Sequence, residues 1–545
     1  MSLLENLTII AYLGLLAWLG LLGWRRTRTS ADYLLAGRNA HPFVMAMSYG
    51  ATFISTAAIV GFGGVAAWLG NSMLWLVFLN IFVGVFIAFV VLGRPTRRMG
   101  HRLDAHTFPE LLGKRFDSRF IQVAGGVLIL GFMPLYAAAV LIGGTRFVAA
   151  YFHVDYHLAL LVFSVIITAY VLAGGLKSVM LTDALQGSIM VVAMLVLGWY
   201  TFDSLGGISQ AYATLREAWE ATVAGPLAAV DLASLPANSP DALMKQSLLL
   251  GFQGWGQMPV TGSPGWLFLV TTLVLGVGIG VLAQPQLIVR FMTVKSQREL
   301  NRSVLIGGLF ILILTGVIYL VGTLTNAWFY LHDGGRNALQ AAGGIAQVIP
   351  HYINSAMPRW FGFLFLFALI SAAMSTLSSQ FHTMGTAVGR DVYERLTGAQ
   401  HDTLGVTRIG VVVMILVSVA LAYAFDQEPA IIARSTALFF ALCASIFLPT
   451  YLGALFWRRM TTTGAIASMV TGFLISGFWL LFVHFKEAKA LGLARALFGT
   501  DSLLSGKVIF VDALVIALPL SALVAVVVSL LTRPLPETHL QRCYG

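Results

Sequence analysis

The sequence predicts an all-α membrane protein with about thirteen transmembrane helices, organised around a core of two inverted repeats. Three observations predict this fold class. Of the 545 residues, 58% are hydrophobic and only 10% are charged, with a mean hydropathy of +0.84, whereas soluble domains carry roughly 25% charged residues. Apolar segments long enough to span a membrane follow one another along most of the chain. Two of these segments are interrupted by glycines, at corresponding positions of the two halves.

The apolar segments give the order of the spans. About 20 apolar residues cross the hydrocarbon core of a bilayer as a helix. By that rule the spans lie at 4–24, 41–70, 72–93, 119–150, 157–174, 179–201, 265–290, 303–330, 358–386, 405–425, 433–457, 461–484 and 508–532. Because Met1–Asn6 carries no positive charge and no cleavage site follows the first segment, we expect a retained span rather than a signal peptide.

Positive charge in the short loops predicts the orientation, since cytoplasmic loops carry an excess of Lys and Arg. The basic segments that fall on one side are Arg25–Arg38, Arg94–Arg119, Arg290–Arg302, 390–395, Trp457–Met460 and the tail with Arg533 and Arg542. We therefore expect a multi-pass protein of the plasma (cytoplasmic or inner) membrane, with the N-terminus outside and the C-terminus in the cytoplasm. These loops account for the net charge of +10, and no basic face is large enough to bind nucleic acid.

The stretch Ser48–Gly64 lies inside the second span and combines four glycines with four hydroxyl side chains. Glycine weakens a helix by about 1 kcal/mol relative to alanine, and hydroxyls offer the backbone competing hydrogen bonds. The mixture indicates a helix that breaks in mid-membrane to line a polar cavity; close packing of helices by small residues is the alternative. The seventh span, within Trp266–Met292, holds three glycines and Pro285, so we expect it to be broken too.

Five spans separate the starts of the two interrupted segments, which is the spacing expected of an inverted-repeat secondary transporter. The predicted division is an extra N-terminal helix and first cytoplasmic loop (1–40), a first repeat (41–201), a long outer loop (202–264), a second repeat (265–457), and two C-terminal helices with a tail (458–545). The outer loop serves either as a lid or as a passive connection.

A face rich in hydroxyl groups occurs in the ninth span. Ala372, Ser375 and Thr376 are spaced i, i+3 and i+4, so they share one side of a helix. Neutral hydroxyls together with carbonyls of an unwound helix can replace the hydration shell of Na⁺ without burying a counter-charge. The alternative is that these hydroxyls bond back to their own helix and only pack against neighbours.

Several motifs, in this order and spacing, resemble the sodium:solute symporter family of sodium/glucose and sodium/proline cotransporters. They are ADYLLAGRNAHPFVMAMSYGATFIS (Ala31–Ser55), GGLKSVMLTDALQG (Gly174–Gly187), QPQLIVRFMTVKSQREL (Gln284–Leu300), AAMSTLSSQ (Ala372–Gln380) with GRDVY (Gly389–Tyr393), and LFWRRMTTTGAIASMVTG (Leu455–Gly472). The resemblance covers Asp32 to about His484. It implies the 5+5 inverted-repeat, LeuT-type core, with one helix before the core and extra helices after it.

The resemblance also implies a site for Na⁺, the coupling ion, between spans two and nine. By position its ligands are the backbone carbonyls of Ala51, Ile54 and Ala372 and the hydroxyls of Ser375 and Thr376. The family's aspartate on the cytoplasmic Na⁺ exit path corresponds to Asp183, whose alternative role is an ion pair with Lys177. Tyr136 matches an aromatic position near the substrate cavity of proline-type members, and ordinary packing is its alternative role.

The sequence departs from the family pattern in the expected substrate cavity. Phe53 stands where proline-type members have Asp, and the polar contacts of sugar transporters are not recognisable. The cavity-facing positions of spans two, seven and eleven look apolar, with Gln284 the main polar exception. A small solute of modest polarity, an amino acid such as proline or a monocarboxylate, therefore fits better than a sugar.

These features predict a secondary active transporter that carries a small organic solute together with Na⁺ by alternating access. Two alternatives stay open: a carrier on the same fold coupled to protons or another cation, and a membrane sensor with a transporter-like core. An enzyme is not expected, because the sequence has no nucleophile–base pair, metal-ligand cluster or phosphate-binding loop. The expected partners are the small solute, Na⁺ and the lipid bilayer.

Overall fold

A computed structural model describes residues 3–25, 30–398, 403–425 and 431–545. Within these ranges the chain forms helices joined by turns and short loops, with one isolated parallel bridge between Ala40 and Val294. Residues 26–29, which belong to the first predicted cytoplasmic loop, lie outside the described residues.

The helices follow the predicted order along the chain. Those of the first half are α1 (Leu3–Arg25), α2 (Ser30–Leu35), α3 (Pro42–Phe53), η2 (Ala57–Gly61), α4 (Phe62–Leu69), α5 (Leu74–Ile81), η4 (Phe82–Gly93), α6 (Arg94–Arg102), α7 (Phe108–Arg115), α8 (Arg119–Phe152), α9 (Tyr156–Ser204), α10 (Ile208–Trp219) and α11 (Pro240–Leu249). Those of the second half are α12 (Pro264–Leu267), η7 (Phe268–Leu275), α13 (Gly276–Gly280), η8 (Val281–Ala283), α14 (Pro285–Phe291), α15 (Gln297–His332), α16 (Ala338–Ala342), α17 (Val348–Ala356), α18 (Arg359–Thr386), η10 (Ala387–Glu394), α19 (Arg395–Thr397), α20 (Thr403–Phe425), α21 (Ile431–Phe456), α22 (Thr462–Phe482), α23 (Glu487–Leu491), α24 (Leu493–Phe498), α25 (Leu514–Leu531) and α26 (Glu537–Tyr544).

Ten helical segments of the described chain are long and apolar enough to cross a membrane. Two further apolar helices, Ile10–Gly23 and Tyr156–Thr168, are shorter. The segment Ala57–Arg102 contains both the second half of predicted span two and the whole of span three. Long apolar helices therefore confirm the multi-pass, all-α class, while the count of thirteen spans stays a prediction.

Both predicted interruptions are present. Span two stops being helical at Ile54, where φ is −88° and ψ is 96°, and helical structure resumes after Ser55. Span seven is broken at Gln284, whose ψ is 114°, and α14 starts at Pro285. Pro285 suits the first position of that helix because it has no backbone N–H to leave unpaired. Each break releases carbonyls from the helical ladder in the middle of the protein.

Predicted spans five and six together form α9, which is kinked at Gly175. The φ of Gly175 is 58° and its ψ is −179°, a conformation that residues with a Cβ rarely adopt. An added Cβ would also lie 2.6 Å from the Tyr33 ring. Gly175 therefore fixes where the fifth span ends and the sixth begins, and so how deep Asp183 lies.

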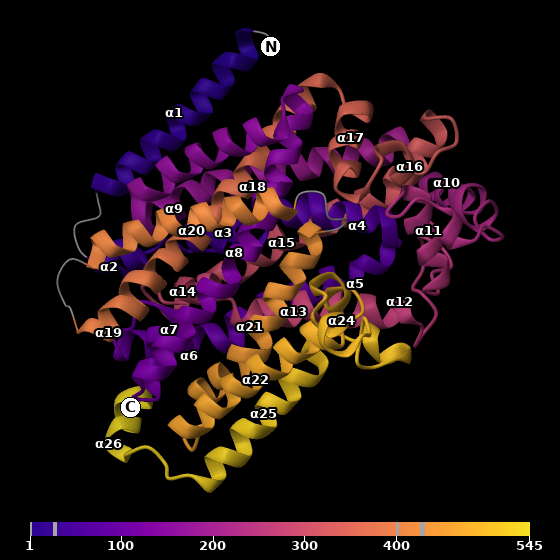
Figure 1. Ribbon diagram of the computed structural model, residues 1–545. Helices are drawn as coiled ribbons and strands as arrows, with labels where there is room; N and C mark the ends of the chain where they lie inside the picture. The colour runs from indigo at the N-terminus through magenta and orange to yellow at the C-terminus, as the bar shows by residue number, and fades with distance from the viewer. Residues whose placement is uncertain (1–2, 26–29, 399–402, 426–430) are drawn as a thin grey trace.

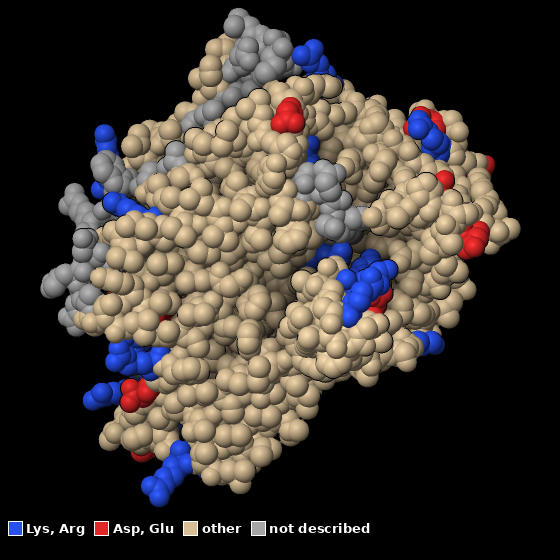
Figure 2. Space-filling view, viewed as in Figure 1, with Lys and Arg blue, Asp and Glu red and all other residues tan. Residues whose placement is uncertain are grey.

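The short helices gather at two opposite ends of the molecule. In Figure 1, α2, α6, α7, α19 and α26 lie at one end, and α10, α11, α16 and α17 lie at the other. Figure 2 shows Lys and Arg at the end with α19 and α26 and also in a group beside α24, while uncharged side chains cover most of the remaining surface. Exposed aromatic residues of predicted span three, such as Phe78, Phe82 and Phe86, suit contact with lipid.

The long loop 202–264 is folded against the end of span two. The indole Nε1 of Trp68 donates a hydrogen bond to the carbonyl of Leu243 (3.1 Å), and the backbone N–H of Asn71 donates to the carbonyl of Trp255 (2.7 Å). Inside the loop, Lys245 Nζ donates to the carbonyls of Leu227 and Ala228, both at 2.9 Å. These contacts attach the loop to a helix of the core, while its role as a lid stays a prediction.

Residues His484–Glu487, which follow α22, fasten the last helices to the outer ends of the core; we call them the outer clasp. Arg434 of α21 pairs with Glu487 at 2.8 Å. Lys486 Nζ lies 5.3 Å from the ring centre of Trp68, 5.1 Å from that of Phe268 and 5.5 Å from that of Phe485, distances at which a cation is attracted to an aromatic face. The outer clasp thus binds spans two, seven and eleven together.

The charge of Glu487 is held by its neighbours. Burial alone would raise the pKa of this carboxyl group, but the hydrogen bond with His484 and the charge of Arg434 outweigh burial and hold the pKa well below its usual range. A carboxyl group whose pKa is lowered by folding stabilises the folded state above its unfolded pKa. Its contribution is therefore complete at neutral pH and is lost as the pH falls below about 4.5 toward the folded value.

We expect Glu487→Gln to lower the free energy of unfolding at pH 7 by about 3 kcal/mol, because it leaves Arg434 charged and unpaired in a largely buried setting. Thermal unfolding in detergent measures the effect, and the difference from the unaltered protein should shrink as the pH is lowered below about 4.5. The matched control is Asp501→Asn, which removes the exposed pair with Arg495 in the same loop and should cost less than about 1 kcal/mol. Equal effects of the two changes would contradict this role of the outer clasp.

Candidate functional site

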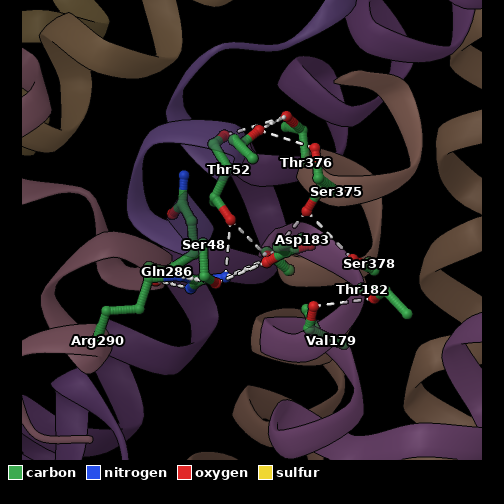
Figure 3. A network of polar contacts seen from close by, with 12 residues as sticks. Ser48, Thr52, Val179, Thr182, Asp183, Gln286, Arg290, Ser375, Thr376 and Ser378 are labelled. Atoms are coloured by element: carbon green, nitrogen blue, oxygen red, sulfur yellow. Dashed lines mark hydrogen bonds and ion pairs between the residues drawn. The ribbon is translucent and has the colours of Figure 1, made fainter. Parts of the chain in front are cut away.

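The broken segment of α3 meets the hydroxyl face of α18, as predicted. Ser375 Oγ donates a hydrogen bond to the carbonyl of Ala51 at 2.8 Å. Thr376 Oγ1 lies 3.3 Å from the same carbonyl and 3.1 Å from that of Thr52. All four residues are fully buried. Figure 3 shows the two hydroxyls directed across the helix interface toward Thr52.

Four of the five predicted Na⁺ ligands share direct contacts. Besides its bond to Ala51, Ser375 Oγ lies 3.3 Å from the carbonyl of Ala372. The fifth, Ile54, is the residue at which α3 ends, and its N–H still donates to Gly50. The structure therefore brings Ala51, Ala372, Ser375 and Thr376 together and places Ile54 at the adjacent break. These oxygens are all neutral, which suits a monovalent hard cation.

Asp183 lies beside this group and does not pair with Lys177, which was its alternative role. Lys177 instead pairs with Asp32 at 3.4 Å. The Oδ2 of Asp183 accepts a hydrogen bond from Ser48 at 2.6 Å and pairs with Arg290 Nη2 at 3.4 Å. Asp183 is fully buried, and an ionisable group at such a position in a membrane protein points to function.

Arg290 is the residue that sequence reasoning misplaced. It was assigned to a basic cytoplasmic loop, but its side chain is only 1% exposed and points into the protein core. The guanidinium donates to Ser48 (3.0 Å), Thr52 (2.7 Å), Ser379 (2.5 Å) and the carbonyl of Gln286 (2.5 Å). The available signal was its position at the last residue of an otherwise apolar predicted span, where a charge needs a buried partner.

The predicted substrate-cavity residues form an aromatic cluster next to the break in span two. The Tyr136 ring lies 5.6 Å from that of Phe439 and 5.4 Å from that of Phe440, and the Phe53 ring lies 6.2 Å from that of Phe440. The Tyr136 hydroxyl donates to Ser55 Oγ at 3.4 Å. Spans two, four and eleven thus meet here. Tyr136 packs against aromatic rings, which was its alternative role, and its hydroxyl also reaches the break in span two.

Gln284 stands at the other break. It is fully buried, and its Oε1 accepts a hydrogen bond from Gln286 Nε2 at 2.6 Å. Its own Nε2 has no hydrogen-bond partner among the described residues. A buried amide donor of this kind is costly unless another group bonds to it, so Gln284 is a candidate contact for a solute.

Comparison with known proteins identifies the family of this chain. The model of the sodium:solute symporter family matches residues 33–472. The chain belongs to the sodium:solute symporter family. This confirms the family and the Na⁺-coupled solute symport that the sequence predicted. The family is one of transporters, consistent with the expectation that the chain is not an enzyme.

Two relatives of this symporter align over most of their length. The osmoregulated proline transporter OpuE of Bacillus subtilis (strain 168) is 28% identical over 454 residues, which cover 82% of this chain and 83% of the relative. A sodium/proline symporter of Staphylococcus aureus is 26% identical over 499 residues, covering 89% and 86%.

A solved structure shows the shared fold. A Na⁺-coupled sialic acid symporter in a substrate-bound, outward-open state superposes with a TM-score of 0.72, at 16% sequence identity, over 98% of this chain and 99% of that one. The predicted all-α, inverted-repeat fold class is thereby confirmed. The boundaries proposed for the repeats and the identity of the site residues stay predictions.

Proposed function

We propose that this symporter carries proline, or a similarly small amino acid, together with Na⁺ across the cytoplasmic membrane. The relatives named above are proline transporters, and they align over more than four fifths of this chain. The single observation that supports the ion's role best is the contact of the Ser375 and Thr376 hydroxyls with the carbonyls of Ala51 and Thr52. It joins the break in the first repeat to the third helix of the second.

Na⁺ binds, in this proposal, where these oxygens converge. The hydroxyls of Ser375 and Thr376 give up their present hydrogen bonds to the carbonyls of Ala51 and Thr52. Their protons rotate away, and their oxygen lone pairs then face the ion. The carbonyls of Ala372 and Ile54 complete the set. Because the ion then links α3 to α18, its binding favours the arrangement in which the two helices stay together, and the solute binds next to it at the break.

Coupling requires only that Na⁺ raise the affinity for the solute, and the effect is then reciprocal. Rocking of the two repeats exposes the site to the cytoplasm, and Na⁺ leaves past Asp183. This direction follows the proposed orientation, with the N-terminus outside and the C-terminus inside. Labelling of single cysteines in intact cells by a membrane-impermeant reagent tests it.

A monocarboxylate is the second candidate solute, and the aromatic cluster around Phe53 favours an amino acid over it. An amino acid presents a cationic amine, which an aromatic cluster such as Phe53, Tyr136 and Phe440 attracts. A monocarboxylate has no such group and gains nothing from the cluster beyond apolar contact. Competition between proline and lactate for uptake distinguishes the two solutes.

The proposal is tested by uptake of radiolabelled proline into proteoliposomes. We expect uptake against the proline gradient when Na⁺ is higher outside, and none when K⁺ replaces Na⁺. A pH gradient imposed without Na⁺ should not drive uptake; if it does, the carrier is proton-coupled. Proline uptake that is indifferent to both gradients would refute the proposed function.

A further inference from the structure

A buried guanidinium separates the proposed Na⁺ site from the end of the protein that we assign to the cytoplasm. Arg290 belongs to α14, the inner half of broken span seven, and bonds to three other elements: α3 through Ser48 and Thr52, α9 through Asp183, and α18 through Ser379. Figure 3 shows it reaching Thr52 and Asp183 from one side. A single side chain thus holds four elements of the core together.

Two residues, Thr52 and Ser379, each form hydrogen bonds both with Arg290 and with a proposed Na⁺ ligand. The hydroxyl of Thr52 accepts from Arg290, while its carbonyl accepts from Thr376. Ser379 Oγ accepts from Arg290 and donates to the carbonyl of Ser375 at 3.0 Å. An ion that changes the positions of Ser375 and Thr376 therefore also changes the bonds of the guanidinium, and the reverse holds.

A second buried carboxylate, that of Asp391, lines the same small cavity as Arg290. A small cavity of about 20 Å³, room for about one water molecule, is lined by Arg290, Gln286, His382 and Asp391 among other residues. Asp391 is 1% exposed and accepts hydrogen bonds from Thr107 (2.6 Å) and Gln122 (3.2 Å), both neutral donors.

In the part of the chain that the structure describes, no cation lies within ion-pair distance of Asp391. A buried carboxylate without a cationic partner is strongly disfavoured. Asp391 is therefore a ready second partner for a guanidinium that already lines the same cavity.

We propose that Arg290 is the gate on the Na⁺ exit path and that it exchanges Asp183 for Asp391 when the ion leaves. This inference rests on the Na⁺ site proposed above. In the arrangement described here the guanidinium is bound to Asp183 and closes the exit. When the core opens toward the cytoplasm, the guanidinium leaves Asp183, moves across the cavity that it shares with Asp391 and pairs with Asp391. Asp183 is then free to receive the departing Na⁺, and the guanidinium has a carboxylate partner at both stages.

The test measures leakage of radiolabelled Na⁺ from proteoliposomes in the absence of any solute, which needs no knowledge of the substrate. Arg290→Gln removes the gate, and we expect the leak to rise about tenfold, within the range of coupling between linked sites. Arg290→Lys keeps a cation beside Asp183 and should restore most of the closure. Asp391→Asn removes the second partner and is tested in a second assay, Na⁺-driven uptake of proline. We expect the maximal rate to fall about tenfold, with an unchanged half-saturating Na⁺ concentration.

The matched control is Arg115→Gln. Arg115 is also fully buried, and it bonds to Ala454 and Tyr544 rather than to any residue of the ion site. Its loss measures the general cost of removing a buried guanidinium, so the leak should stay at the unaltered level. A leak in Arg290→Gln no larger than in Arg115→Gln overturns the gate, provided that the unaltered protein shows Na⁺-driven uptake.

If the unaltered protein shows no Na⁺-driven uptake, both the gate and the proposed function are overturned. Should Arg290→Gln fail to give folded protein, Asp391→Asn decides the question alone. An unchanged maximal rate then overturns the exchange of partners.

Discussion

Replacing Ser375 and Thr376 together by alanine should raise the Na⁺ concentration for half-maximal uptake about 100-fold or more. Each hydroxyl that contacts a full charge contributes about 1.5–3 kcal/mol, and about 2.8 kcal/mol in total already corresponds to a factor of 100. Proline uptake at saturating proline, measured as a function of external Na⁺, gives the shift directly. The maximal rate should recover at high Na⁺ if the remaining carbonyl ligands still hold the ion.

The control for this pair is Ser418→Ala combined with Thr315→Ala. Both hydroxyls are fully buried and donate to a carbonyl four residues earlier in their own helix, Ser418 to Met414 at 2.8 Å and Thr315 to Ile311 at 2.7 Å. The double change removes the same chemical groups without touching the break in span two. A similar loss of Na⁺ affinity in both double variants would mean that Ser375 and Thr376 only pack.

Replacing Gly280 by alanine should destabilise the protein by about 1–3 kcal/mol, as expected of overpacking in a tight core. A Cβ at Gly280 would lie 2.4 Å from the carbonyl oxygen of Phe440 and 2.6 Å from its Cβ. Span seven and span eleven must therefore separate, and Phe440 would move away from Tyr136 and Phe53. Thermal unfolding measures the loss of stability, and the Michaelis constant for proline should rise with it.

The matched control for Gly280 is Gly276, one turn earlier in the same segment. The nearest atom to an added Cβ at Gly276 is 3.6 Å away, an ordinary contact. Alanine should then be neutral or stabilise the helix by up to about 1 kcal/mol, since it restricts the unfolded chain more than glycine does. A destabilisation of Gly276→Ala as large as that of Gly280→Ala would show that packing between spans seven and eleven is not the cause.

The broken spans and the hydroxyl face were predictable because each has a local signature. Glycines and hydroxyls concentrated in Ser48–Gly64 weaken a helix at that point whatever surrounds it. The spacing of Ala372, Ser375 and Thr376 places them on one side of any helix that contains them. These local rules predicted each feature separately, and it was the resemblance to the symporter family that placed the two helices side by side.

Arg290 was not predictable in the same way. An arginine at the end of an apolar segment can reach the interface or turn inward, and both fit the same sequence. The choice depends on Asp183, Ser48 and Ser379, which come from three other helices, and on the depth that Gly175 sets for the first of them. The outer clasp was not predictable for the same reason. In the sequence Lys486 is an ordinary loop lysine, and its role depends on contacts with Trp68 and Phe268, which come from two distant segments of the chain.

The opposite charges of Asp183 and Arg290, 3.4 Å apart, have a consequence for the electrical behaviour of the carrier. This pair and the proposed ligand set are each neutral overall, so the ion site carries no net charge when it is empty and one positive charge when Na⁺ is bound. A membrane potential acts on charge alone, at about 2.3 kcal/mol per 100 mV for one elementary charge. It should therefore speed the inward step of the loaded carrier and leave the return of the empty carrier unaffected. At saturating Na⁺ and solute, the inward current should reach a plateau at negative voltage, because the electroneutral return then limits the cycle.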